Sequence, residues 1–345
     1  MKKILLAGAL LTAGAVVVAQ NANSITGSGA SAPFPLYTEM FNTYATQTSV
    51  KVNYASKGSG GGRADIIARN VDFAGSDAFM TDTELKSAPG AIIHVPMALV
   101  AVVPTYNIPG VTTQLKFTGQ ILASIYLGDI KKWNDPAIVA LNKTAKLPDL
   151  AIAPVYRSDS SGTTAIFVDF LSKVSSDWAA KVSKGPQGSV KWPVGTGGPQ
   201  NAGVVGLVRQ TPGGIGYAEV TYAKANKLQY GSIRNATGKF VDGGDLNEIA
   251  AASDAQSLPD DTRTSITNAS IGYPISGFTW ILVYKDQKYG SRTKDQAKAL
   301  VSLLRWMLTD GQKINNKLDY GQIDGSALKK AQKNVESMNY GGEKL

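Results

Sequence analysis

The chain has 345 residues, of which 43% are hydrophobic and 18% charged, and it contains 36 glycines and no cysteine. This composition is typical of a compact, loop-rich globular protein and excludes a disordered chain or a coiled coil. The absence of cysteine excludes disulfides, cysteine nucleophiles, thiolate metal sites and a lipid-modified N-terminus. The formal net charge is +9, but no lysine and arginine cluster is interleaved with aromatic residues, so nucleic acid is not an expected partner.

Residues 1–19 have the features of a secretory signal peptide. Residues 2 and 3 are lysines, residues 4–18 are apolar or small, and Val17-Val18-Ala19 offers small residues for cleavage. An uncleaved membrane anchor is the alternative, although the apolar run is short for a bilayer span. We expect residues 1–19 to be removed on export to a bacterial periplasm, which leaves enough chain for about two domains.

Up to residue 110 the sequence predicts one helix followed by three strands. A helix over 35–44 places Leu36, Met40 and Tyr44 on one face. The three strands are expected at 50–56, 71–78 and 92–103, followed by a turn at 107–110. The last strand is almost continuously apolar, which predicts that it is buried.

The rest of the chain alternates helices and strands, which favours an α/β protein with largely parallel sheets flanked by helices. The polar, weakly periodic residues 223–272 are interpreted as irregular segments that belong to the second domain. The expected elements are a helix through 121–126, a turn at 127–138, a strand at 150–155, a helix at 163–174, a loop, helix and strand over 194–220, a strand at 278–284 and a helix at 294–308.

Three loops rich in glycine and serine each run into a helix-like segment. They are GSGASAPFP at 27–35, SKGSGGGRADII at 56–67 and YRSDSSGTTAIF at 156–167. A helix start presents unpaired backbone N–H groups and the positive end of the helix dipole, and small hydroxyl residues add donors without bulk. Three such loops in one chain predict a site built around an oxyanion.

The third loop is the densest group of candidate ligands. Arg157 offers a planar fork of donors suited to a tetrahedral oxyanion, and Asp159 could hold the guanidinium in place. Ser161 and Thr163 supply hydroxyls, and Gly162 and Thr163 supply amides at the helix start. The alternative interpretation is an ordinary helix cap with a surface ion pair.

Asp77 is an unusual residue for an anion site because it carries the same charge as the ligand. It ends the predicted strand at 71–78 and is either a turn or N-cap aspartate or an acceptor for a ligand that carries a proton. Phosphate keeps one or two protons at neutral pH, whereas sulfate keeps none. A carboxylate facing the ligand would therefore favour phosphate over sulfate.

Several other chemistries find little support in the sequence. Gly27-x-Gly29-x-x-Ala32 lacks the acidic residue that a dinucleotide site needs about 20 positions later, and residues 58–63 lack the Lys-Ser/Thr end of a P-loop. His94, the single histidine, lies in an apolar strand and is interpreted as a structural residue. Without a second histidine or any cysteine, neither a serine hydrolase nor a transition-metal site is expected.

The order of these motifs resembles the periplasmic phosphate-binding proteins of the phosphate ABC transporter, the PstS type. The resemblance covers nearly the whole chain after residue 24. Its motifs are ITGSGASAPFPLY (25–37), GSGGG (58–62), VDFAGSDA (71–78), NIPG (107–110), IYLGDIKKWND (125–135), YRSDSSGTT (156–164), VKWPVGTGG (190–198), GGIGYAEVTYA (213–223) and YPISGFTWILVYKDQ (273–287).

The resemblance implies a set of ligand contacts in this chain, with Asp159 as the partner of the arginine. Two positions depart from the family pattern: Ala32 replaces a phenylalanine, and Gly60 stands where a second serine is often found. Only a backbone contact is expected at position 32, so binding should survive. The implied phosphate contacts are Ser31, the amide of Ala32, Ser59, Asp77, Arg157, Ser161, Gly162 and Thr163.

The resemblance also implies a two-lobe periplasmic binding protein fold whose lobes are joined by crossing hinge strands. We expect lobe I to comprise 24–103 and 275–345 and lobe II to comprise 104–274. The implied function is capture of inorganic phosphate by a monomer and its delivery to a membrane permease, with no catalysis, metal or cofactor. The alternatives are a receptor for sulfate or molybdate and, as another class, a secreted phosphatase.

Overall fold

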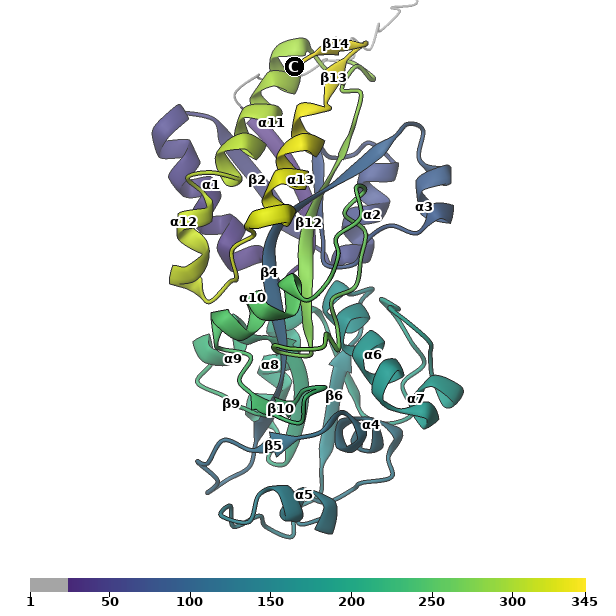
Figure 1. The fold of residues 1–345 in the computed structure, drawn as a ribbon, viewed down its shortest axis with the longest axis vertical. Helices are drawn as coiled ribbons and strands as arrows, with labels where there is room; N and C mark the ends of the chain where they lie inside the picture. The colour runs from purple at the N-terminus through teal and green to yellow at the C-terminus, as the bar shows by residue number, and fades with distance from the viewer. Residues whose placement is uncertain (1–23) are drawn as a thin grey trace, which may run out of the picture.

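The computed structural model describes residues 24–345, so the predicted signal peptide at 1–19 lies outside the described residues. Figure 1 shows an elongated molecule with two lobes stacked along its long axis. The purple N-terminal and yellow C-terminal elements form the upper lobe, and the teal and green elements of the middle of the chain form the lower one. Within residues 24–345, no helix is long and apolar enough to cross a bilayer.

The first part of the chain confirms the predicted helix and the three predicted strands. Leu36, Met40 and Tyr44 are buried on one face of the first helix, as a 3.6-residue period requires. The fourth strand runs on to Asn107 before the chain turns. The elements are β1 (Ser24–Gly29), α1 (Phe34–Thr48), β2 (Lys51–Ser56), α2 (Ser59–Ile67), β3 (Phe73–Ser76), α3 (Asp82–Ser87) and β4 (Ile92–Asn107).

The middle of the chain also follows the predicted order, with small shifts in the boundaries. The strand expected at 150–155 begins at Ala153, and the turn at 127–138 runs into a short helix. The polar residues 223–272 hold three short strands and a helix. The elements are β5 (Lys116–Phe117), α4 (Gly119–Leu127), α5 (Pro136–Leu141), β6 (Ala153–Arg157), α6 (Gly162–Val174), α7 (Ser176–Lys181), β7 (Thr196–Gly198), α8 (Gln200–Gln210), β8 (Gly214–Glu219), α9 (Val220–Ala225), β9 (Gln229–Tyr230), β10 (Ser232–Arg234), β11 (Phe240–Val241) and α10 (Leu246–Asp254).

The C-terminal part returns to the upper lobe and includes one helix, near its end, that the sequence pattern did not indicate. This helix, α13, buries Ala327, Ala331 and Val335, and its two alanines give little hydrophobic signal. The predicted strand at 278–284 and helix at 294–308 are confirmed. The elements are β12 (Ser276–Tyr284), α11 (Lys294–Met307), α12 (Gln312–Asn315), a 3₁₀ turn (Asn316–Leu318), α13 (Gly325–Glu336), β13 (Asn339–Tyr340) and β14 (Glu343–Lys344).

One continuous sheet runs through both lobes, in the order β2-β1-β3-β12-β4-β8-β6-β7, with β9 also on β4. The pairs at its two ends are parallel, as expected: β2 and β3 with β1, and β8 and β7 with β6. The central strands are antiparallel. β4 pairs with β12 over Ile92–Ala101 and with β8 over Val102–Asn107, so this strand carries the chain from one lobe into the other.

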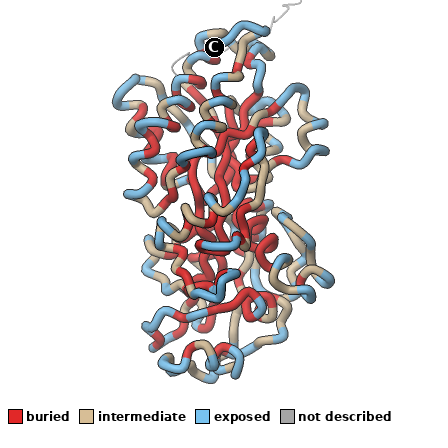
Figure 2. Tube along the Cα trace, in the orientation of Figure 1, coloured by how far each residue is buried: buried red, intermediate tan, exposed pale blue. Residues whose placement is uncertain are grey.

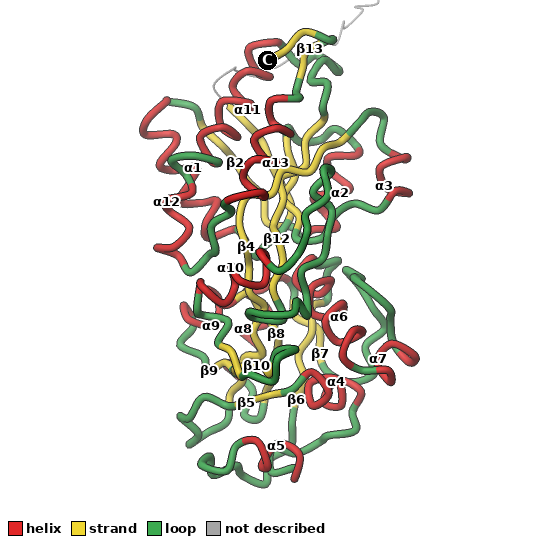
Figure 3. The backbone as a smooth tube through the Cα atoms, in the orientation of Figure 1, coloured by secondary structure: helices red, strands yellow, loops and turns green. Residues whose placement is uncertain are grey.

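The core follows these central strands. Every residue of β12 is buried, and Figure 2 shows the buried tube running along the middle of the molecule while the exposed segments lie outside. Helices flank the strands of both lobes in Figure 3. The parallel strands β1, β3 and β6 end near the place where the two lobes meet. Helices begin there, and in open α/β sheets the ligand lies beyond such strand ends.

Candidate functional site

Four helices, α1, α2, α6 and α8, begin close to one another where the lobes meet. The Gly60 N–H donates to Ser160 O at 3.0 Å, which joins the start of α2 to the loop before α6. Asn201, in the first turn of α8, donates through Nδ2 to Ser31 Oγ at 3.0 Å, just before α1. A Cβ atom on Gly162 would lie 2.5 Å from Ser59 Oγ. The lobes are therefore in direct contact around these helix starts.

Asp77 lies at this junction, immediately after β3, and is only 3% exposed. Its backbone N–H donates to Ser59 Oγ at 3.1 Å, and its Oδ1 is buried without a hydrogen-bond partner among the described residues. Burial raises the pKa of Asp77 to about 6, although Thr279 and Arg157 nearby offset part of the rise. Thr81 caps α3, so the N-cap interpretation of Asp77 is wrong.

Arg157 ends β6 and is held in one orientation by Asp159. Its Nε donates to Asp159 Oδ1 at 2.8 Å and its Nη2 to Oδ2 at 2.5 Å, while Nη1 reaches Thr163 Oγ1 at 3.3 Å. Partial burial of Asp159 opposes ionisation, but the guanidinium holds its pKa below the usual value. Three of the five N–H donors of Arg157 are thus engaged, which leaves one on each terminal nitrogen for a ligand.

The buried hydroxyls of the site accept hydrogen bonds from protein N–H groups. Ser161 Oγ accepts from Thr164 N at 3.0 Å, Ser31 Oγ accepts from Asn201, and Thr163 Oγ1 accepts from Arg157 and Asn201. A hydroxyl that accepts in this way keeps its own hydrogen to donate. Ser161 also caps α6, so the helix-cap interpretation is correct as well, and the amides of Gly162 and Thr163 remain without intrahelical partners.

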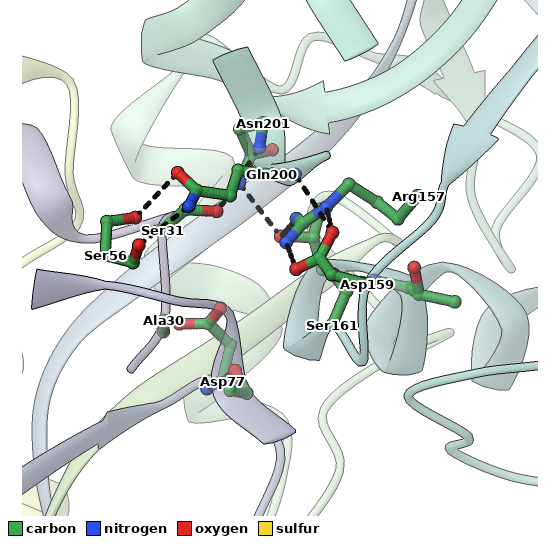
Figure 4. Close-up of polar contacts among 12 residues, drawn as sticks. Ala30, Ser31, Ser56, Asp77, Arg157, Asp159, Ser161, Gln200 and Asn201 are labelled. Carbon is green, nitrogen blue, oxygen red and sulfur yellow. Dashed lines mark hydrogen bonds and ion pairs between the residues drawn. The ribbon is translucent and has the colours of Figure 1, made fainter. Parts of the chain in front are cut away.

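The structure brings all the sequence-predicted site residues together at this junction. Figure 4 shows Ser31 and Asp77, from the N-terminal elements, near Arg157, Asp159 and Ser161 from the other lobe. Tyr320 OH donates to the carbonyl of Ala32 at 2.7 Å, which fixes the loop after Ser31. His94 lies elsewhere, buried in β4, where its Nε2 accepts from Met80 N at 2.9 Å.

Gln200 and Asn201 belong to the site, although neither was among the predicted residues. Asn201 is fully buried and touches Ser31 and Thr163, and Gln200 N donates to Asp159 Oδ1 at 2.9 Å. Both follow the segment GTGGP at 195–199, a fourth glycine-rich loop before a helix. That similarity to the three predicted loops is the signal that could have identified them.

The chemistry of the site is therefore a group of donors gathered around the buried carboxylate of Asp77. Within the part of the chain that the structure describes, no group of three or more histidine, aspartate or glutamate side chains is placed to hold a metal ion. A ligand that fits such a group is an anion with several acceptor oxygens and at least one proton to donate.

Comparisons of the sequence with known proteins agree on one family. Residues 16–310 match the model of a PBP superfamily domain. The chain is 41% identical over 315 residues to phosphate-binding protein PstS of Pasteurella multocida, covering 90% of this chain and 89% of the relative. It is 42% identical over 323 residues to PstS of Haemophilus influenzae, covering 92% of this chain and 94% of the relative.

Solved structures of phosphate-binding proteins have the same fold at much lower identity. PfluDING, a high-affinity periplasmic phosphate-binding protein solved with bound phosphate, aligns with a TM-score of 0.73 and 20% identity over 92% of this chain and 99% of its own. The phosphate-binding protein of Stenotrophomonas maltophilia aligns with a TM-score of 0.70 and 18% identity over 90% and 93%. At such identity the likeness establishes the fold alone.

Proposed function

This chain belongs to the PstS family of phosphate-binding proteins within the PBP superfamily, and on that premise we propose that it captures inorganic phosphate between its lobes and delivers it to an ABC-type importer. The curated relatives carry the name phosphate-binding protein. The proposed role requires binding and release but no chemical step, so the chain is not an enzyme in this proposal.

The observation that carries the proposal is the combination of many hydrogen-bond donors with the buried carboxylate of Asp77. Arg157 would give its two remaining N–H groups to the anion as a charge-assisted pair. The hydroxyls of Ser31, Ser59, Ser161 and Thr163 and the amides of Ala32, Gly162 and Thr163 would supply the other donors. In all of these contacts the anion is the hydrogen-bond acceptor.

Asp77, unlike these donors, would accept a hydrogen bond from the anion. Phosphate near neutral pH carries a proton on at least one oxygen, and that hydroxyl can donate to the buried Oδ1, which has no hydrogen-bond partner within residues 24–345. Sulfate and molybdate would instead place an unprotonated oxygen against the carboxylate, which is repulsive in a buried site. This argument favours phosphate over the other tetrahedral oxyanions.

The fold offers a way to enclose the ligand. We propose that 24–103 with 275–345 form lobe I and that 104–274 form lobe II, hinged at the strands β4 and β12. Contacts such as Gly60 to Ser160 would form on closure, bury the anion and order both lobes together. The protein would act in the periplasm as a monomer and present its closed form to the permease.

The test is calorimetric titration of the phosphate-free protein with phosphate, sulfate and molybdate at equal ionic strength. Saturable 1:1 binding of phosphate, with no heat from the other two anions at the same concentrations, is the expected result. Equal binding of sulfate would contradict the assignment. A parallel phosphatase assay with added Mg²⁺ or Zn²⁺ should show no turnover.

A further inference from the structure

Gln200 holds an unusual backbone conformation at the start of α8, with φ at +58°. Residues other than glycine rarely adopt positive φ, because their Cβ atom then crowds the backbone. Such a strained residue in a native structure points to a role that the conformation serves. We propose that the Gln200 side chain is a latch between the lobes that sets how long phosphate stays bound; the inference rests on the proposed function.

The side chain makes a matched pair of hydrogen bonds with Ser56, the last residue of β2. Ser56 Oγ donates to Gln200 Oε1 at 3.0 Å, and Gln200 Nε2 donates to the backbone oxygen of Ser56 at 2.7 Å. The two residues are 144 positions apart in the chain. Ser56 ends β2 in the upper lobe and Gln200 begins α8 in the lower lobe (Figure 1), and their side chains meet in Figure 4. This pair can therefore form only when the lobes have come together.

The Gln200 side chain lies at the edge of the site, whereas its backbone N–H reaches Asp159 within the site. Gln200 and Ser56 are both partly exposed, whereas Ser31 and Asn201 next to them are buried at 2% and 0% exposure. An anion held by Arg157 and the buried hydroxyls would not need to touch Gln200. The side chain would instead slow the opening that precedes release, which is a change in the dissociation rate.

The backbone of the same residue explains why the strained conformation is kept. The Gln200 N–H donates to Asp159 Oδ1 at 2.9 Å, and the next N–H, that of Asn201, reaches Ser31 Oγ at 3.3 Å. The positive φ thus directs two successive N–H groups to the carboxylate that orients Arg157 and to the first loop. A glycine at position 200 would keep these backbone contacts and lose only the contacts of the side chain.

The Gln200→Gly variant therefore separates the latch from the fold. It relieves the backbone strain, so the unfolding free energy of the phosphate-free variant should equal or exceed that of the parent. Stopped-flow release of phosphate should become about tenfold faster, since two hydrogen bonds between the lobes are lost, while the association rate should stay within about twofold. Lys227→Gly is the matched control, because Lys227 also has positive φ (54°) but lies exposed after α9.

A double-mutant cycle with Ser56→Ala identifies the partner. In the parent this change removes one of the two hydrogen bonds and should speed release about threefold. In the Gln200→Gly background it should have no further effect. Release from Gln200→Gly at the parent rate, or fully additive effects of the two changes, would overturn the latch. A parent protein that does not bind phosphate would instead overturn the proposed function.

Discussion

The backbone N–H of Asp77 donates to Ser59 Oγ at 3.1 Å, which ties the residue after β3 to the first residue of α2. The bond holds the Asp77 main chain and occupies an acceptor position of the serine hydroxyl. The Asp77 carboxylate, which would accept from the ligand, and the Ser59 hydroxyl, which would donate to it, therefore belong to neighbouring residues of the site.

Exchanging the carboxylate of Asp77 for an amide should weaken the discrimination between phosphate and sulfate. In the parent, excess sulfate should not compete with labelled phosphate. In Asp77→Asn the ratio of the two affinities should narrow by on the order of tenfold or more, mainly because repulsion of sulfate is relieved. Competition binding of both proteins at matched ionic strength measures the ratio; an unchanged ratio would remove Asp77 as the selector.

Asp77 should also destabilise the closed form above pH 6 when no ligand is bound, because its carboxylate is buried there between the lobes. Burial raises its pKa from 3.8 to about 6, so its contribution to stability is fully present below pH 4 and is lost as the pH rises through about 6. The shift corresponds to about 3 kcal/mol at pH 7. Raising the pH from 4 to 7.5 should therefore shift the phosphate-free parent toward the open form, seen as a larger radius of gyration in X-ray scattering, and should have little effect on phosphate-free Asp77→Asn. An equal pH dependence in the two proteins would contradict this.

His94 should act on stability in the opposite direction. Burial lowers its pKa from 6.5 to about 3, so its contribution is present above pH 6.5 and is lost as the pH falls toward 3. A loss of about 3 kcal/mol by pH 4 is expected in the parent from this group. In His94→Gln an uncharged side chain can still accept from Met80 N, so the unfolding free energy of the variant should rise relative to the parent as the pH drops from 6.5 to 4. Parallel curves for the two proteins would exclude this role.

Arg157 should be the side chain whose loss costs the most affinity. Arg157→Ala removes the fork and leaves the Asp159 carboxylate without its guanidinium partner, and a loss on the order of a hundredfold or more is expected by calorimetric titration. Arg157→Lys keeps the charge without the fork and should lose less. Arg209→Ala, on the exposed end of α8, is the control and should bind within about twofold of the parent. An Arg157→Ala protein that binds within a few-fold would place the arginine outside the site.

Phosphate should convert an open form in solution into the closed form seen here. The radius of gyration from X-ray scattering should fall on addition of phosphate to the phosphate-free protein, and the melting temperature should rise with phosphate concentration. The ligand adds about 2.7 kcal/mol at a hundred times Kd. If phosphate changed neither quantity, a receptor that closes on its ligand would be ruled out.

The sequence by itself determined the helix starts and the strands that build this site. The loops before α1, α2 and α6 carry glycine and small hydroxyl residues next to apolar-periodic segments, and both signals act over a few residues. The order of motifs then indicated the family and the predicted set from Ser31 to Thr163. No helix was predicted over α13, whose buried face consists mostly of alanines, so that the helix has a low mean hydropathy although its apolar and polar faces are well separated.

Only the tertiary structure decided which loops meet and which polar atoms still have a hydrogen-bond donor or acceptor position free for a ligand. Gln200 and Ser56 are 144 positions apart, and no local pattern links them. The same holds for Asp77: its type and place could be read from the chain, but its raised pKa and its buried, unpartnered oxygen arise from the residues packed around it. Desolvation and hydrogen-bond partnership depend on every group within a few ångströms, and those groups come from all parts of the chain.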